Sequence, residues 1–176
     1  MKIAILGKMC SGKTTIATII QEHDKDYKTF SFGGAVKKYA KEIFNMQGKN
    51  RSLLVNFANK MREIDRDVWV RPVIAESRLF DKCIVDDVRY QNELDALVND
   101  NWIIVQLRIS EGLQEKRIKE TYPENYQDHL DNRSHICEKN EFIFKTGYPH
   151  LSIQVDEYTK DTLRELILTF LEKNVF

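Results

Sequence analysis

One short segment constrains the fold of this chain more than any other: residues 7–15, which read GKMCSGKTT. The segment has the full spelling of a phosphate-binding loop, two glycines separated by four residues, with Lys and Thr directly after the second. An apolar run precedes the loop (residues 2–6, KIAIL), and isoleucines at helical spacing follow it (residues 14–23). Strand, loop and helix in this order predict a loop that holds the phosphates of a nucleotide.

Phosphate binding explains the residue types in this loop. Glycines let backbone N–H groups curl around phosphate oxygens, and the start of the following helix adds partial positive charge. Lys13 can reach the β- and γ-phosphates, and the hydroxyl of Thr14 can ligate Mg²⁺. The predicted nucleotide-binding residues are Gly7, Lys8, Cys10, Ser11, Gly12, Lys13, Thr14 and Thr15.

A second apolar run, residues 82–87 (KCIVDD), ends in two acids. Acids at the carboxyl end of a buried strand lie beside the phosphate loop, so one of the two should approach Mg²⁺. The pattern by itself does not choose between Asp86 and Asp87.

The rest of the chain alternates between short apolar runs and amphipathic stretches. Strands are expected at residues 2–6, 27–32, 82–87, 102–109, 141–145 and 151–155, and helices at 14–23, 33–44, 51–64, 67–80, 90–100, 111–121 and 159–173. This alternation predicts an α/β protein with the three-layer P-loop NTPase fold, a parallel sheet flanked by helices. No linker or repeat divides residues 1–176, so one domain is expected.

Composition excludes several classes of function. Lys and Arg number 27 and Asp and Glu also number 27, so the formal net charge is zero, unlike that of a protein that coats a nucleic acid polymer. The N-terminal apolar run is too short for a signal peptide or a membrane span. Three scattered cysteines favour a reducing compartment. We therefore expect a cytoplasmic protein (host cytoplasm, if it is viral) with no membrane or nucleic-acid partner.

The phosphate loop alone does not separate kinases from GTPases or transporter ATPases. A GTPase would carry Asn-Lys-x-Asp to read guanine, and residues 59–62 (NKMR) lack the Asp; a Ser-Gly-Gly-Gln-like transporter signature is also absent from the sequence. Planar guanidinium groups suit the loose transition state of phosphoryl transfer, whose negative charge is spread over oxygens. The chain has such groups spaced through expected loops and strand ends, at Arg62, Arg89, Arg108, Arg117 and Arg133, which favours a kinase.

Four segments resemble the phage and viral deoxynucleoside monophosphate kinases, which belong to the P-loop nucleoside monophosphate kinases. They are residues 31–38 (SFGGAVKK), 61–70 (MREIDRDVWV), 86–94 (DDVRYQNEL) and 133–140 (RSHICEKN). The most specific is the Asp-Val-Arg-aromatic-x-Asn-Glu segment, which favours Asp87 for the metal. The resemblance implies transfer of the γ-phosphoryl group from ATP, with Mg²⁺, to a deoxynucleoside 5′-monophosphate (dNMP), in a homodimer.

The resemblance also implies roles for single residues. Arg62 and Arg89 would hold the acceptor phosphate, and residues 111–140 would form a lid. The implied substrate-binding residues are Phe32, Lys37, Arg62, Trp69, Asp87, Arg89 and Glu93, the catalytic residues are Lys13, Arg89, Arg108 and Arg117, and the metal ligands are Thr14 and Asp87. Two departures from the family pattern are Cys137, where Ser is usual, and residues 33–35 (GGA), where Ala-Asp-Pro is frequent.

Two other interpretations stay open at this stage. The chain could be another small-molecule P-loop kinase, of the dephospho-CoA or phosphomevalonate type. It could also be a regulatory protein that holds a nucleotide without turning over an acceptor. The preferred base, and ribose against deoxyribose, are not specified by any motif.

Overall fold

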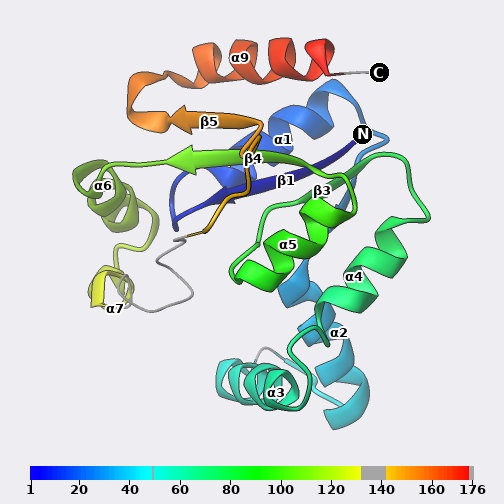
Figure 1. The fold of residues 1–176 in the computed structure, drawn as a ribbon. Coiled ribbons are helices and arrows are strands. Elements are labelled where there is room, and N and C mark those ends of the chain that lie inside the picture. Colours follow the sequence, from blue (N-terminus) through cyan, green and yellow to red (C-terminus); the bar gives the residue numbers. More distant parts are fainter. Residues whose placement is uncertain (49, 132–141, 175–176) are drawn as a thin grey trace.

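The computed structural model describes residues 1–48, 50–131 and 142–174. Its centre is one parallel sheet, whose described strands run in the order β2-β3-β1-β4-β5 (Figure 1). The strands are β1 (Lys2–Gly7), β2 (Lys28–Phe30), β3 (Cys83–Val85), β4 (Ile103–Arg108) and β5 (Leu151–Gln154).

β1 lies in the middle of the sheet and is covered on both faces. Ile3 pairs in register with Ile84 of β3 and with Ile103 of β4. Residues 3–6 of β1 are all 0% exposed. An unbroken apolar run is the pattern expected for such a strand, because neither of its faces meets water.

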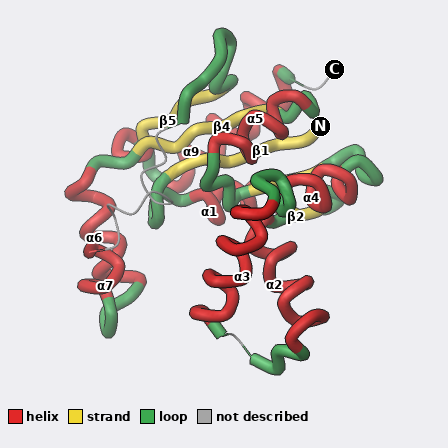
Figure 2. Tube along the Cα trace, turned by 60° about the horizontal axis from the view of Figure 1, so that its bottom comes forward, coloured by secondary structure: helices red, strands yellow, loops and turns green. Residues whose placement is uncertain are grey.

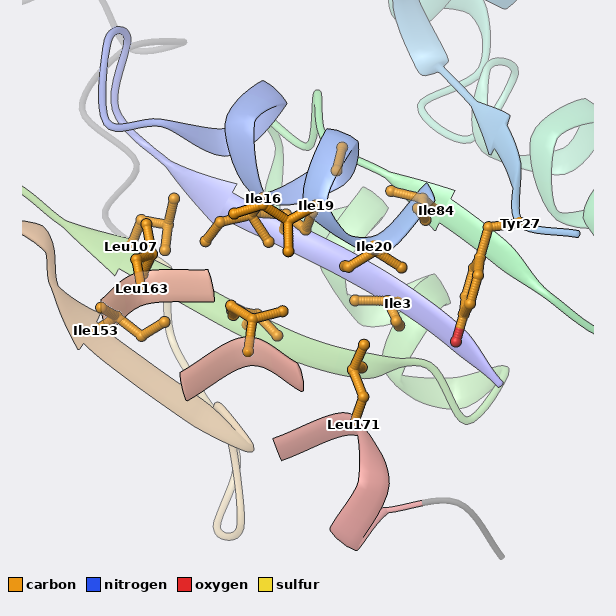
Figure 3. Close-up of a cluster of buried hydrophobic side chains, with 14 of the residues drawn as sticks. Ile3, Ile16, Ile19, Ile20, Tyr27, Ile84, Leu107, Ile153, Leu163 and Leu171 are labelled. Atoms are coloured by element: carbon orange, nitrogen blue, oxygen red, sulfur yellow. The ribbon is translucent and has the colours of Figure 1, made fainter. Parts of the chain in front are cut away.

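Alternate residues of β1 enter different cores. Ile3 and Ile5 pack with α1 (Lys13–His23) and α9 (Lys160–Lys173) on one face of the sheet (Figure 3). Ala4 and Leu6 pack with α4 (Val70–Ser77) and α5 (Gln91–Asn99) on the other. The result is a helix–sheet–helix sandwich.

The remaining helices flank the carboxyl edge of the sheet. α2 (Phe32–Phe44) and α3 (Arg51–Ile64) lie side by side and project from the sheet (Figure 2). Their shared core includes Val36, Ala40, Leu54 and Ala58. α6 (Glu111–Thr121) and α7 (Tyr126–Asp131) lie at another side of this edge, and a short 3₁₀ helix, η2 (Val155–Glu157), follows β5.

This topology places a ligand site at the end of β1. The chain leaves β1 towards β2 on one side and leaves β3 towards β4 on the other, so the connections diverge around the central strands. In open α/β sheets ligands bind outside the carboxyl ends of the strands where the connections diverge. The loop after β1 lies at that point.

The predicted α/β P-loop NTPase fold is confirmed, with differences in single elements. The expected helix at 67–80 begins only at Val70, so Pro72 falls in its first turn, where a missing N–H costs little. Residues 142–145 do not form the expected strand. The segment 133–140, with Arg133 and Cys137, lies outside the described residues. Among those described, no helix has the length and apolar character needed to cross a bilayer.

Candidate active site

The loop after β1 adopts the compact conformation that its glycines permit. Cys10 and Gly12 have left-handed backbone angles, φ 60° and 99°. A Cβ on Gly7 would lie 2.5 Å from the hydroxyl oxygen of Ser11, so this position has no room for a side chain. The Lys13 ammonium donates to the carbonyl oxygens of Gly7 (2.7 Å) and Lys8 (3.0 Å). The lysine is thereby held over the loop.

The loop has the features of a phosphate site. The N-cap of α1 is Gly12, so no side chain caps the first amides of this 11-residue helix. The hydroxyl of Ser11 is buried and has no hydrogen-bond partner among the described residues. Uncapped amides, the helix dipole and Lys13 together suit a polyphosphate. The residues present therefore fit the triphosphate of ATP.

The two acids after β3 face different partners. Thr14 Oγ1 donates to Asp86 Oδ2 at 3.3 Å. Asp87 instead accepts hydrogen bonds at the start of α2, from Ser31 Oγ (2.6 Å) and from the amides of Phe32 (3.1 Å) and Gly33 (2.8 Å). The carboxylate beside Thr14 is thus Asp86, whereas the sequence favoured Asp87 for the metal.

A cavity of about 730 Å³ lies between the phosphate loop, the end of β3, the start of α3 and the α6–α7 region. Its cationic side chains include Lys13 and Arg89, as expected from the sequence, and also Arg51, the first residue of α3. The lining residues are Gly7, Met9, Cys10, Lys13, Thr14, Arg51, Asp86, Asp87, Val88, Arg89, Tyr122, Asn125 and His129. We call this space the acceptor cavity.

A second cavity, of about 500 Å³, lies on the other side of the phosphate loop, against α6 and the start of α9. Arg117 belongs to this space, and its Nη1 donates to the carbonyl oxygen of Cys10 at 3.2 Å. The lining residues are Cys10, Gly12, Lys13, Thr14, Thr15, Arg117, Thr121, Tyr122, Val155, Tyr158, Thr159, Lys160 and Leu163. We call this space the donor cavity. Arg117 therefore lines the donor cavity and is not among the residues that line the acceptor cavity.

Arg62 and Glu93 form a cluster behind the acceptor cavity. The Arg62 guanidinium lies 4.3 Å from the ring centre of Tyr90 and 3.8 Å from Glu93 Oε1. Glu93 is 2% exposed, and its carboxylate accepts the amides of Arg89 (2.8 Å) and Tyr90 (3.1 Å). Burial raises the pKa of Glu93 to about 7, against the opposing effect of these amides and of Arg62. Glu93 is a buried support of the loop that carries Arg89, not a surface that a ligand can touch.

Two aromatic residues expected to face the acceptor are core residues instead. Trp69 is 2% exposed, and its indole N–H donates to the carbonyl oxygen of Ala58 at 3.1 Å. Phe32 is equally buried, in the core formed with α4 and α5. Neither ring is available to stack on a base, because neighbouring side chains cover it.

The other expected residues are dispersed. Lys37 is exposed on α2, and Arg108 lines a separate cavity of about 190 Å³ behind Gly7. Neither lines the acceptor cavity. Sequence reasoning missed Arg51, Tyr122, Asn125 and His129, which reach the cavity from segments without a motif.

A large cavity elsewhere, about 760 Å³, lies at the opposite edge of the sheet. It is bordered by the start of β1, the end of α1 and the end of α9, and none of its lining residues comes from the phosphate loop. Volume alone therefore does not locate the chemistry.

Comparisons with known proteins agree with the fold. A family model described as AAA domain matches residues 3–141. No curated protein matches the chain. A gluconokinase from Sinorhizobium meliloti 1021 superposes with a TM-score of 0.54 at 14% identity, over 98% of this chain and 91% of that one. Shikimate kinase from Aquifex aeolicus vf5 superposes with a TM-score of 0.51 at 17% identity, over 99% of this chain and 98% of that one. Shikimate kinase from Acinetobacter baumannii, in complex with shikimate, superposes with a TM-score of 0.53 at 17% identity, over 98% of this chain and 93% of that one. These likenesses identify the fold as that of small-molecule P-loop kinases.

Proposed function

Because the chain belongs to the AAA domain family and folds like small-molecule P-loop kinases, we propose that it transfers the γ-phosphoryl group of ATP to a deoxynucleoside 5′-monophosphate. The observation that carries this proposal is the acceptor cavity, which combines the phosphate loop with Arg51 and Arg89. A kinase that phosphorylates a phosphate needs cations on both sides of the transferred group.

The donor half of the site follows from the phosphate loop. The loop amides and Lys13 would hold the β- and γ-phosphates, and the donor cavity would take the nucleoside, with Arg117 at its wall. Thr14 and Asp86 offer adjacent oxygens, the ligand type that Mg²⁺ prefers. When bound there, the ion would neutralise charge on the phosphate oxygens.

The acceptor half favours an acceptor whose attacking oxygen is already ionised. A hydroxyl acceptor needs a base. Among the described residues that line the cavity, the carboxylates Asp86 and Asp87 already hold hydrogen bonds, which leaves His129 of α7 as the remaining candidate base. Asp87 already accepts three hydrogen bonds, and Asp86 lies against Thr14. A carboxylate has about four lone-pair sites, and donors of this chain occupy three of those on Asp87. A phosphate oxygen has no proton to remove at neutral pH, so it can attack the γ-phosphorus directly.

The transfer then needs little beyond alignment. Arg51 and Arg89 would orient the acceptor phosphate in line with the bond between the γ-phosphorus and the leaving ADP oxygen, while Lys13 balances the developing charge. Tyr122, Asn125 and His129 border the same cavity from the α6–α7 side, where they would limit access of water.

Release of ADP with a panel of acceptors tests the proposal. The panel contains dAMP, dGMP, dCMP and dTMP, the corresponding ribonucleotides, phosphomevalonate and dephospho-CoA, each compared with an acceptor-free blank. We expect ADP release above the blank with at least one dNMP, and none with Lys13→Ala. Release only with phosphomevalonate or only with dephospho-CoA would assign the chain to the corresponding alternative. ATP binding without release on any acceptor would favour a regulatory role.

A further inference from the structure

α6 contacts the phosphate loop through a side chain that no motif predicts. Gln114 is 4% exposed, and its Nε2 donates to the carbonyl oxygen of Met9 at 3.0 Å. Three residues later on the same helix, Arg117 Nη1 donates to the carbonyl oxygen of Cys10 at 3.2 Å. Two successive carbonyls of the loop are therefore held by one helix.

The residue between these contacts has an unfavourable backbone conformation. Cys10 has φ 60°, a left-handed angle that a residue with a Cβ adopts only at a cost. Gly12 shares the left-handed region, where a glycine has no such cost. The conformation of Cys10 must therefore be maintained by contacts around it, and the bonds from α6 are on both of its flanking peptides.

These bonds also orient loop amides. Across a trans peptide the carbonyl of one residue and the N–H of the next point in opposite directions. With the Met9 carbonyl directed to α6, the N–H of Cys10 is directed away from it. Gln114 is suited to this role because it is neutral and buried, so it fixes the carbonyl without placing another charge beside the phosphates.

We propose that Gln114 is a positioning residue for the donor nucleotide, which holds Cys10 and its neighbouring amides in the conformation that receives the β- and γ-phosphates. The inference rests on one part of the proposed function, that the loop binds the phosphates of ATP. It does not depend on which acceptor is phosphorylated.

The test measures binding rather than turnover. Wild type and Gln114→Met, which keeps the side-chain size but removes the donor, are titrated with a fluorescent ATP analogue that is displaced by ATP or by inorganic tripolyphosphate. We expect Gln114→Met to weaken both competitors by about 5- to 10-fold, the equivalent of one hydrogen bond. Lys116→Met is the matched control, because Lys116 lies exposed on the same helix, and it should change neither affinity more than about twofold.

Tripolyphosphate separates a positioning role from a structural one. A residue that only supports the fold would lower the unfolding temperature of the nucleotide-free protein and leave both affinities unchanged well below that temperature, which overturns the proposal. The proposal is also overturned if Gln114→Met weakens the binding of ATP but not of tripolyphosphate, because the substitution would then affect the nucleoside and not the phosphates. Should Gln114→Met not fold, Gln114→Leu replaces it, since it also lacks the donor and adds no charge beside the phosphates, and wild-type affinity in that variant likewise overturns the proposal.

The result also distinguishes this inference from the proposed function. A wild type that binds neither ATP nor tripolyphosphate contradicts both. A wild type that binds ATP but phosphorylates no dNMP contradicts only the proposed acceptor, and the variant still decides the role of Gln114.

Discussion

The hydroxyl of Ser31 donates a 2.6 Å hydrogen bond to the carboxylate of Asp87, and this contact fixes the acid at the end of β3 to the start of α2. Ser31 is also the N-cap of α2, where its oxygen accepts the amide of Gly34 at 2.8 Å. The same carboxylate accepts hydrogen bonds from the amides of Phe32 and Gly33. Asp87 therefore places a negative charge at the start of α2, where the helix dipole is positive. Asp86, one residue earlier, is left to face Thr14.

Replacement of Asp87 should therefore affect mainly stability, and replacement of Asp86 mainly activity. We expect Asp87→Ala to lower the free energy of unfolding by about 2–4 kcal/mol, because it leaves the start of α2 without its charged partner. Asp86→Ala should stay within about 1 kcal/mol of wild type in stability and lose Mg²⁺-dependent ADP release. Urea denaturation and the ADP assay measure the two effects. The reverse pattern, with a stable but inactive Asp87→Ala and an active Asp86→Ala, would indicate that Asp87 and not Asp86 ligates Mg²⁺.

Glu93 predicts a pH-dependent stability. Burial, the largest influence on this group, raises its pKa from 4.5 to about 7 in the folded protein. Between these pH values the folded state retains a proton that the unfolded state has released, so stability falls as pH rises. The loss should reach up to about 3 kcal/mol by pH 8 and should be absent below pH about 4.

The measurement compares wild type with Glu93→Gln across this range. Since other groups titrate alike in both proteins, the difference between their unfolding free energies isolates Glu93. We expect this difference to shift in favour of Glu93→Gln as the pH rises from about 4.5 to about 7. A difference that stays constant with pH would show that the pKa of Glu93 is the same in the folded and unfolded states, which contradicts the prediction.

Local spacing predicted the phosphate loop and the central sheet because both depend on neighbours in sequence. The loop is a continuous motif, and β1 is a continuous apolar run. Local spacing could not predict which of Asp86 and Asp87 faces Thr14, because Asp87 is held by a hydrogen bond from Ser31, which is 56 positions away. Gln114 was missed for the same reason, since its partner Met9 is 105 positions away.

Aromatic residues were the other source of error. Trp69 and Phe32 belong to segments that resemble an acceptor pocket, but an apolar ring suits a core and a base platform equally well. Packing decides between them, and it depends on how α2, α3 and α4 meet. Arg51 shows the converse: a charged residue without a motif, brought to the acceptor cavity by the start of α3.

Arg51 and Arg89 should determine acceptor affinity. Each contributes a guanidinium to the acceptor cavity, and loss of a charge-assisted hydrogen bond to phosphate costs about 1.5–3 kcal/mol. We expect Arg51→Ala and Arg89→Ala each to raise the Michaelis constant for the dNMP by about 10- to 100-fold, with ATP affinity nearly unchanged. Lys60→Ala, an exposed change on the same helix as Arg51, is the control. Equal acceptor constants in Arg51→Ala and wild type would remove Arg51 from the site.

Trp69 should affect stability and not substrate recognition. Its indole N–H bonds to Ala58, and its ring lies 5.2 Å from that of Phe57 and 6.2 Å from that of Tyr39, between α2 and α3. Trp69→Phe removes the hydrogen bond and part of the packed volume, so we expect a loss of about 1–3 kcal/mol in the free energy of unfolding. The Michaelis constants for all four dNMPs, measured well below the unfolding temperature, should change by less than about twofold, because the ring is buried and does not line the acceptor cavity. A selective rise for one base, with unfolding unchanged, would mean that the ring stacks on the acceptor after all. Arg89→Ala provides the contrast in the same assay, since it should raise these constants while leaving stability nearly intact.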